Sequence, residues 1–206
     1  MKGDVMMGSR MMHAIIANRI ADQLSIKDKP SFLLGGIAPD AVSPKEASHF
    51  YSGDVNDYTR RIDYEQFIHK YNKHIHSDYM LGYYTHLIAD DLWLKGFYLP
   101  WLKNRMEKDE SIFTQYHQDF RLLNGKLLNY YSIAEEIKAN LQNDGVVIEL
   151  EEVSRNAVIH FIPHIIEDIH YNSSVIHEPL NVFTLDQIVG YIETSVDMGL
   201  MHLKRV

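Results

Sequence analysis

The chain has 206 residues, 46% of them hydrophobic and 23% charged, which is enough apolar material for one sizeable core and excludes a disordered or collagen-like protein. Its 20 basic and 28 acidic residues give a formal net charge of -8, and the basic residues are not clustered, which excludes extended nucleic-acid binding. It has no cysteine, so any metal must be held by histidine and carboxylate. There is no signal-like run over residues 1–12 and no stretch of about 18 apolar residues, so a cytoplasmic protein without a transmembrane segment is expected.

Helical periodicity dominates the first half of the chain. Apolar residues at three- and four-residue spacing predict a helix over 10–24, with Ser9 as its N-cap. A short helix over 31–39 is expected to end in a tight corner at Pro39 and Asp40, because glycine and proline disfavour a longer one. The composition then indicates a loop over 42–57, a helix over 59–71 and a central core helix over 78–94, capped by Ser77.

The second half of the chain is also predicted to be helical. Only residues 145–150 are ambiguous between strand and other structure, and no repeat or linker divides the chain. We therefore expect an all-α multi-helix bundle that forms a single domain over residues 1–206. Apolar spacing places the further helices near 102–106, 112–131, 133–141, 148–170 and 185–203, with a break or kink at Pro163.

The sequence contains 12 histidines, and the spacing of His86 and Asp90 is the most informative among them. These two residues stand at i and i+4 of the core helix, so both side chains leave the same face and could bind one metal or simply hydrogen-bond to each other. His13 lies in the apolar stripe of the first helix, Asp40 lies at the glycine–proline corner, and His49 follows in the loop. Zinc accepts this mixture of nitrogen and oxygen ligands.

The segments 12–18, 32–40, 48–50 and 81–93 contain these residues in the order His, Asp, His, His-x3-Asp. In combination they resemble the zinc-dependent phospholipase C family and its relatives, the P1-type nucleases, over roughly residues 9–100. The resemblance implies the helical bundle of that family, with one or two Zn²⁺ ions or another divalent transition metal. It implies that Asp40, His49, His86 and Asp90 surround one metal and that His13 joins Asp90 on a second.

The same resemblance implies hydrolysis of a phosphodiester by a metal-activated water, with Asp40 as general base. The substrate would be a small phosphoester or a lipid headgroup. Family members with three metals have a further histidine shortly after the His-x3-Asp motif, which this chain lacks. His160, His164 and Glu167 share a predicted helix face and are candidate substitutes.

The sequence lacks the histidine motifs of two other classes of metal-dependent hydrolase. No histidine is followed by aspartate, as an HD-type phosphohydrolase requires, and no His-Glu-x-x-His motif of a metalloprotease occurs. The remaining alternative is a helical protein with a structural or sensing metal site and no catalysis. Tyr83, one turn before His86, is expected to face a substrate pocket if the protein is an enzyme.

Overall fold

Side-chain caps define the two helices that carry the metal-binding candidates in the computed structural model, which describes residues 9–206. Helix α1 (Arg10–Leu24) begins after Ser9, whose hydroxyl accepts a hydrogen bond from the Met12 N–H. Helix α4 (Asp78–Trp93) begins in the same way after Ser77, which accepts from the Met80 N–H. Both helix starts are confirmed, because N-capping depends on residues that are neighbours in the sequence.

The predicted corner at the end of the second helix is confirmed. Helix α2 (Lys29–Ile37) starts two residues earlier than predicted because Asp28 caps it and Pro30 suits its first turn. It passes directly into the 3₁₀-helix η1 (Ala38–Ala41), which contains Asp40.

The prediction for residues 42–71 is wrong in one respect. Strand β1 (Tyr51–Ser52) pairs with strand β2 (Arg61–Ile62) in an antiparallel hairpin, so these residues are neither all loop nor helix. Helix α3 (Tyr64–Lys70) begins only after Asp63, whose side chain accepts from the Gln66 N–H. Strands of only two residues are too short to leave a periodic signal in the sequence.

The boundaries in the second half of the chain also differ from the prediction. Pro100 does not separate two helices, because a π-helical segment runs through it. Residues 148–154 are not helical, and α8 starts after Ser154, then continues through the exposed Pro163 without a break. The elements are η2 (Leu94–Leu102), α5 (Lys103–Lys108), α6 (Ser111–Tyr131), α7 (Ala134–Gln142), α8 (Arg155–Ile169), η3 (Ser173–Ile176) and α9 (Leu185–Leu203).

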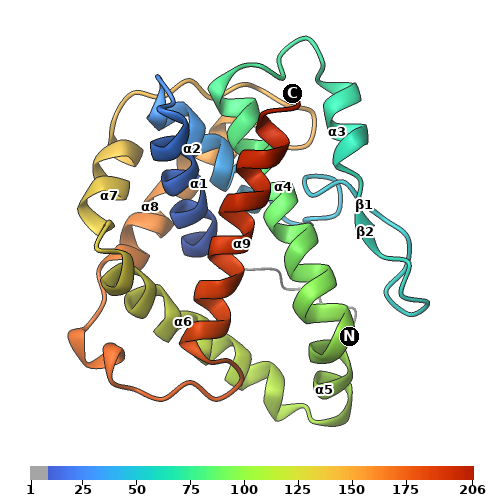
Figure 1. The fold of residues 1–206 in the computed structure, drawn as a ribbon, viewed down its shortest axis with the longest axis vertical. Helices are drawn as coiled ribbons and strands as arrows, with labels where there is room; N and C mark the ends of the chain where they lie inside the picture. Colours follow the sequence, from blue (N-terminus) through green and yellow to red (C-terminus); the bar gives the residue numbers. More distant parts are fainter. Residues whose placement is uncertain (1–8) are drawn as a thin grey trace.

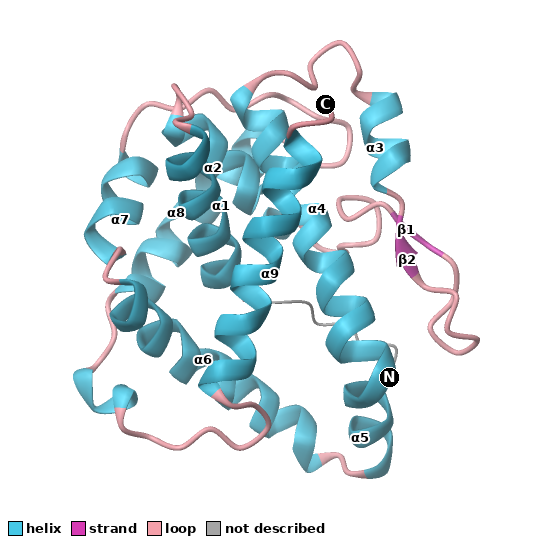
Figure 2. Cartoon of the chain, in the orientation of Figure 1, coloured by secondary structure: helices cyan, strands magenta, loops and turns pink. Residues whose placement is uncertain are grey.

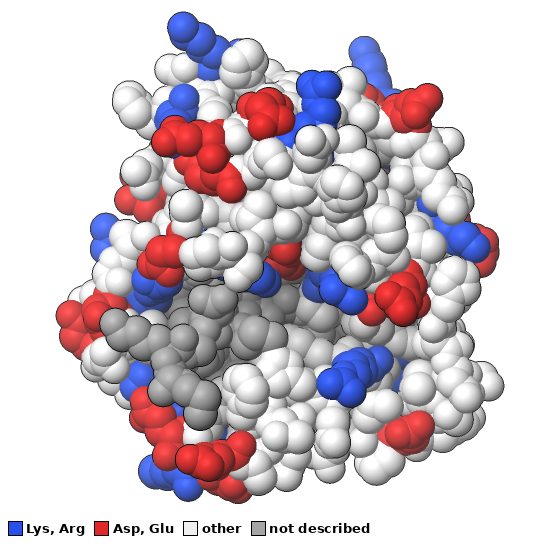
Figure 3. Space-filling view, turned by 180° about the vertical axis from the view of Figure 1, so that it is seen from behind, with Lys and Arg blue, Asp and Glu red and all other residues white. Residues whose placement is uncertain are grey.

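The core is a single helical assembly in which α9 runs alongside α1 and α4 (Figure 1). Helices dominate the chain, and the short hairpin projects at one edge (Figure 2). In residues 9–206 no helix is long and apolar enough to span a bilayer. On the face seen from behind, the basic and acidic side chains of the described residues are interspersed (Figure 3).

Helices α2 and α4 approach each other backbone to backbone through glycines. A Cβ at Gly82 would lie 2.0 Å from the Phe32 carbonyl oxygen, and one at Gly35 would lie 1.9 Å from the Tyr79 oxygen. Only glycine allows this separation, because any side chain at either position would overlap backbone atoms of the opposite helix. The close contact fixes α2, and the η1 corner that follows it, against the polar face of α4.

Candidate metal centre

The structure brings together all five residues that the sequence singles out. His13 comes from the first turn of α1, His86 and Asp90 from α4, Asp40 from η1, and His49 from the turn before β1. All five are buried, and the Asp90 side chain is 0% exposed. Residues separated by up to 77 positions therefore form one polar cluster inside an apolar core.

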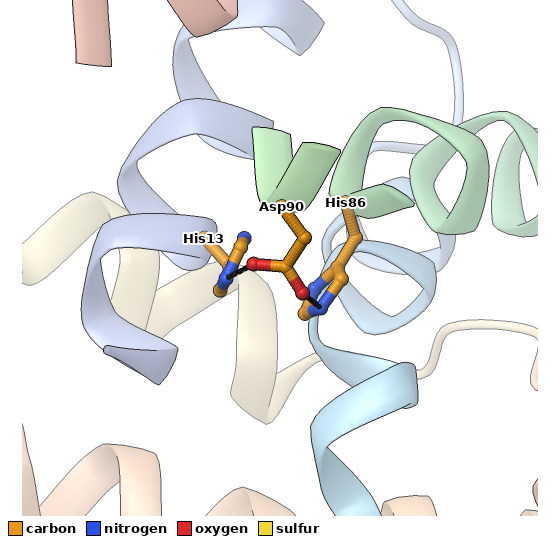
Figure 4. A group of neighbouring side chains, drawn as sticks. All are labelled: His13, His86 and Asp90. Carbon is orange, nitrogen blue, oxygen red and sulfur yellow. Dashed lines mark ion pairs between the residues drawn. The ribbon is translucent and has the colours of Figure 1, made fainter. Parts of the chain in front are cut away.

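Asp90 lies at the centre of this cluster. Its Oδ1 is 3.1 Å from His13 Nε2, and its Oδ2 is 3.1 Å from His86 Nε2 and 3.0 Å from His49 Nε2. Figure 4 shows Asp90 between His13 and His86, with one carboxylate oxygen directed to each ring. Among the described residues, neither oxygen receives a hydrogen bond of acceptable geometry, which is costly for a fully buried carboxylate.

Backbone carbonyls fix the orientation of two imidazole rings. His86 Nδ1 is 2.8 Å from the Gly36 oxygen, and His49 Nδ1 is 3.1 Å from the Lys45 oxygen. A carbonyl only accepts, so each Nδ1 carries the proton and, in the neutral ring, each Nε2 presents a lone pair. The two Nε2 atoms are 3.3 Å apart, so a proton or a cation must separate them. Metal-ligating histidines usually donate the N–H of their other ring nitrogen to a carbonyl or carboxylate, as Nδ1 does here.

Asp40 connects the cluster to a cationic side chain. Its Oδ1 is 3.5 Å from His49 Nε2 and forms an ion pair with Lys45 Nζ. Burial opposes ionisation of Asp40, but Lys45 and the hydrogen bond with His49 hold its pKa well below the usual range. Asp40 is therefore a carboxylate at neutral pH.

The two central histidines have opposite electrostatic environments. Burial opposes a charge on His49, but Asp40 and Asp90 raise its pKa to about 9. Burial, followed by the neighbouring His13, lowers the pKa of His86 to about 4. In the metal-free protein, one imidazolium at His49 thus balances part of the carboxylate charge.

The donor set fits a metal ion. Two overlapping groups, His13–His86–Asp90 and Asp40–His49–His86, each have ligand atoms within 4.8 Å of one another. Both ring nitrogens of His13 lack a hydrogen-bond partner among the described residues, as do both oxygens of Asp90. Imidazole nitrogens combined with carboxylate oxygens suit zinc and similar divalent ions. The buried histidine and aspartate groups could therefore hold a metal ion.

Three contacts that support the candidate ligands are not predicted from the sequence. The Gly36 carbonyl accepts from His86. The Gly35–Gly36 pair is the sequence signal that could have indicated a close approach of α2 to α4. Lys45 pairs with Asp40, and Tyr51 stacks on His49 with ring centroids 5.5 Å apart and planes 7° apart. Neither contact has a sequence signal, because both depend on the path of the loop.

Arg60 supports Tyr51 from the other side of the hairpin. Its guanidinium carbon lies 4.0 Å from the Tyr51 ring centroid, and its two terminal nitrogens are 2.7 and 2.6 Å from the Glu46 carboxylate. The ion pair and the stacked rings therefore hold the turn that carries His49 in place.

The candidate substitutes on α8 lie away from the site, and the expectation that Tyr83 faces a pocket is wrong. His160, His164 and Glu167 are all exposed on α8 and belong to neither metal-binding group, so they do not substitute for a missing ligand. Tyr83 is completely buried, and its hydroxyl donates to the Ser48 oxygen at 2.6 Å, so it supports the turn before His49 instead of facing a pocket.

A cleft of about 370 Å³ reaches the cluster at Asp40. Asp40 is the only one of the five candidate ligands that lines it. A molecule in the cleft would therefore meet the candidate metal centre at this carboxylate. The lining residues are Ser9, Arg10, Asp40, Lys45, His117, Phe120, Arg121, Asn124, Phe161 and Asp168.

Comparison of the chain with protein-family models, with curated proteins and with solved structures found no match. The resemblance to the zinc-dependent phospholipase C family therefore stays a prediction. The structure establishes a single helical domain with buried histidine and aspartate groups that could bind a metal ion.

Proposed function

We propose that this protein is a zinc-dependent hydrolase of phosphoesters, that phosphodiesters are its main substrates, and that its bundle is of the phospholipase C and P1 nuclease type. One observation carries the proposal. The two oxygens of the buried Asp90 carboxylate face different histidines, His13 on one side and His86 with His49 on the other, without hydrogen bonds among the described residues. A carboxylate in this situation is suited to bridge two cations.

The candidate ligands have separate tasks in this proposal. His13 and Asp90 would hold one ion, and Asp40, His49 and His86 would complete the other together with Asp90. A bound zinc ion lowers the pKa of water from 15.7 to about 7 and offsets the charge of a phosphoester. The Gly36 and Lys45 carbonyls keep the rings of His86 and His49 oriented with Nε2 toward the centre.

Asp40 is the residue that we assign as general base. It is ionised, because its pKa is held well below the usual range although burial opposes ionisation, so it can accept a proton from an attacking water. It also lines the cleft, which places it between the cluster and a molecule entering from solvent. Lys45 Nζ pairs with Asp40 Oδ1 and thereby fixes the carboxylate.

A specific observation favours the alternative, a structural or sensing metal without catalysis. The side chains of all five candidate ligands are at most 3% exposed, as in closed sites that serve stability. The cleft at Asp40 favours the hydrolase, because a closed structural site needs no access for a substrate.

Hydrolysis by the zinc-loaded wild type separates the two functions, and Asp40→Asn tests the assignment of the general base. The zinc-loaded wild type is expected to hydrolyse bis(4-nitrophenyl) phosphate and to lose this activity on chelation. Asp40→Asn should lower kcat by about 100-fold or more while zinc content, measured by elemental analysis, is retained, because the amide cannot accept the proton. Asp197→Asn, at an exposed position of α9, serves as the matched control with unchanged activity.

If the zinc-loaded wild type hydrolyses no phosphodiester or phosphomonoester in a broad panel, the hydrolase proposal fails and the structural or sensing function takes its place. If Asp40→Asn loses both zinc and turnover, Asp40 is chiefly a ligand and not the base.

A further inference from the structure

The cleft beside Asp40 is lined by two arginines, Arg10 and Arg121, that the hydrolase proposal does not use. Three cationic side chains, Arg10, Lys45 and Arg121, line it together with two carboxylates, Asp40 and Asp168. We infer that this cleft binds an anionic substituent of the substrate, so that the substrate class is a phosphoester with a second negatively charged group and not a choline-type ester. This inference rests on the proposed function.

Arg10 is held in place at one wall of the cleft. Its Nε and Nη2 are 2.5 and 3.0 Å from the two oxygens of Asp168, and its guanidinium carbon lies 5.7 Å from the Phe161 ring centroid. Arg10 is also one turn before His13 on α1, so the same helix carries a cleft cation and a candidate metal ligand. A guanidinium fixed by a carboxylate loses little freedom when it binds an anion, which favours binding.

Arg121 supplies a charge that no carboxylate of the described residues neutralises. It comes from α6, is exposed, and forms no ion pair with a carboxylate of residues 9–206. Its neighbour His117, one turn earlier, also lines the cleft, and burial followed by the charge of Arg121 lowers the pKa of His117. The Arg121 guanidinium can donate two parallel hydrogen bonds to a carboxylate or phosphate.

The cleft size and charge together define the substituent. A volume of about 370 Å³ lies near the lower end of small-molecule sites, which span about 300–1,000 Å³. It accommodates a group of headgroup size beside the reacting phosphate. A trimethylammonium group there would meet the Arg121 guanidinium, whose charge no carboxylate of the described residues pairs with, and like charges in a partly desolvated cleft repel each other.

Binding of inorganic pyrophosphate to the metal-free full chain tests the cleft independently of catalysis. In isothermal titration calorimetry, Arg121→Gln should weaken binding about tenfold, because the amide cannot donate the charge-assisted hydrogen bonds of the guanidinium. Arg61→Gln removes the same charge from an exposed position outside the cleft and should change the dissociation constant less than about twofold, as expected for screened surface charges.

Two results of this titration overturn the inference. One is the absence of pyrophosphate binding to the wild type. The other is equal weakening by Arg121→Gln and Arg61→Gln, which would indicate a general charge effect. Neither depends on zinc or turnover, so both are distinguishable from failure of the hydrolase proposal, in which binding is intact but no ester is hydrolysed.

A pair of substrates tests the same cleft during turnover. The zinc-loaded enzyme should hydrolyse 2-carboxyethyl 4-nitrophenyl phosphate with a higher kcat/KM than choline 4-nitrophenyl phosphate, and Arg121→Gln should lower only the former, about tenfold. Equal rates, or a preference for the choline ester, overturn the inference.

Turnover of lipid vesicles identifies the source of the anionic group. Turnover of phosphatidylinositol 4-phosphate vesicles, but not of phosphatidylcholine vesicles, supports the inference with a lipid headgroup as the source. Turnover of the soluble anionic ester alone supports it with a free phosphoester.

Discussion

Helices α4 and α8 carry similar residue patterns with different structural outcomes. Each has ionisable side chains one turn apart: His86 and Asp90 on α4, and His160 and His164 on α8. The α4 pair is buried and meets ligands from other elements, whereas the α8 pair is exposed. Spacing therefore identifies which side chains share a face, but the elements that cover this face decide whether they form a site.

The physical origin of the difference is the neighbour of each polar face. The polar face of α4 lies against α1 and η1, which supply His13 and Asp40. Helix α8 turns its apolar residues Val158, Ile165 and Ile169 to the core and leaves its histidines to solvent. Its pattern is that of an ordinary amphipathic surface helix.

The largest effect is expected from Gly82→Ala, which disturbs the close contact between α2 and α4. The added Cβ would overlap the Phe32 oxygen at 2.0 Å, so α2 and α4 must separate, and the free energy of unfolding should fall by about 4 kcal/mol or more in urea titrations. The control is Gly190→Ala, whose Cβ meets nothing within 4 Å, and it should stabilise the protein by up to about 1 kcal/mol. Equal stability of both variants would refute a tight α2–α4 contact.

The metal-binding contrast between the two helices is tested by His86→Ala and His160→Ala. The first should lose most of its zinc in elemental analysis after dialysis, because His86 belongs to both candidate groups. The second should keep wild-type zinc content. Circular dichroism verifies the fold, and His49→Ala provides a second loss variant if His86→Ala misfolds. Zinc loss from His160→Ala instead would place the site on α8.

Chelation should lower thermal stability, since ligands from α1, η1 and α4 are tied together by a bound ion. At a zinc concentration 100 times the dissociation constant the gain is about 2.7 kcal/mol, or roughly 5–10 °C in Tm for a chain of this size. Differential scanning calorimetry before and after chelation measures it. His86→Ala should show no chelation effect, and an unchanged wild-type Tm would mean that zinc contributes nothing to the fold.

The smallest effect is expected from Tyr51→Leu. Tyr51 stacks on His49 and orients its ring but is not itself a candidate ligand, so the zinc dissociation constant should rise about tenfold in competition with a chromophoric chelator. Tyr130→Leu, at a tyrosine that is 56% exposed on α6, should leave zinc affinity unchanged. Similar affinities of the two variants would assign Tyr51 to packing alone.

The sequence by itself predicts much of the fold, because helix signals are local. The Ser9 and Ser77 caps and the periodic apolar residues identify α1 and α4. Local signals fail where the conformation of a segment depends on residues outside it. Residues 61–62 join a hairpin, and residues 148–154, predicted as helix, are irregular.

The candidate site divides in the same way. The sequence determined which five side chains are suited to bind a metal, since His86 and Asp90 share a face and the corner at Asp40 follows from its glycines and proline. Only the tertiary structure decided that Lys45 pairs with Asp40, that Tyr51 stacks on His49, and that α8 takes no part. These contacts join segments whose separation is set by how whole helices pack, and side-chain spacing within one segment holds no information about that packing.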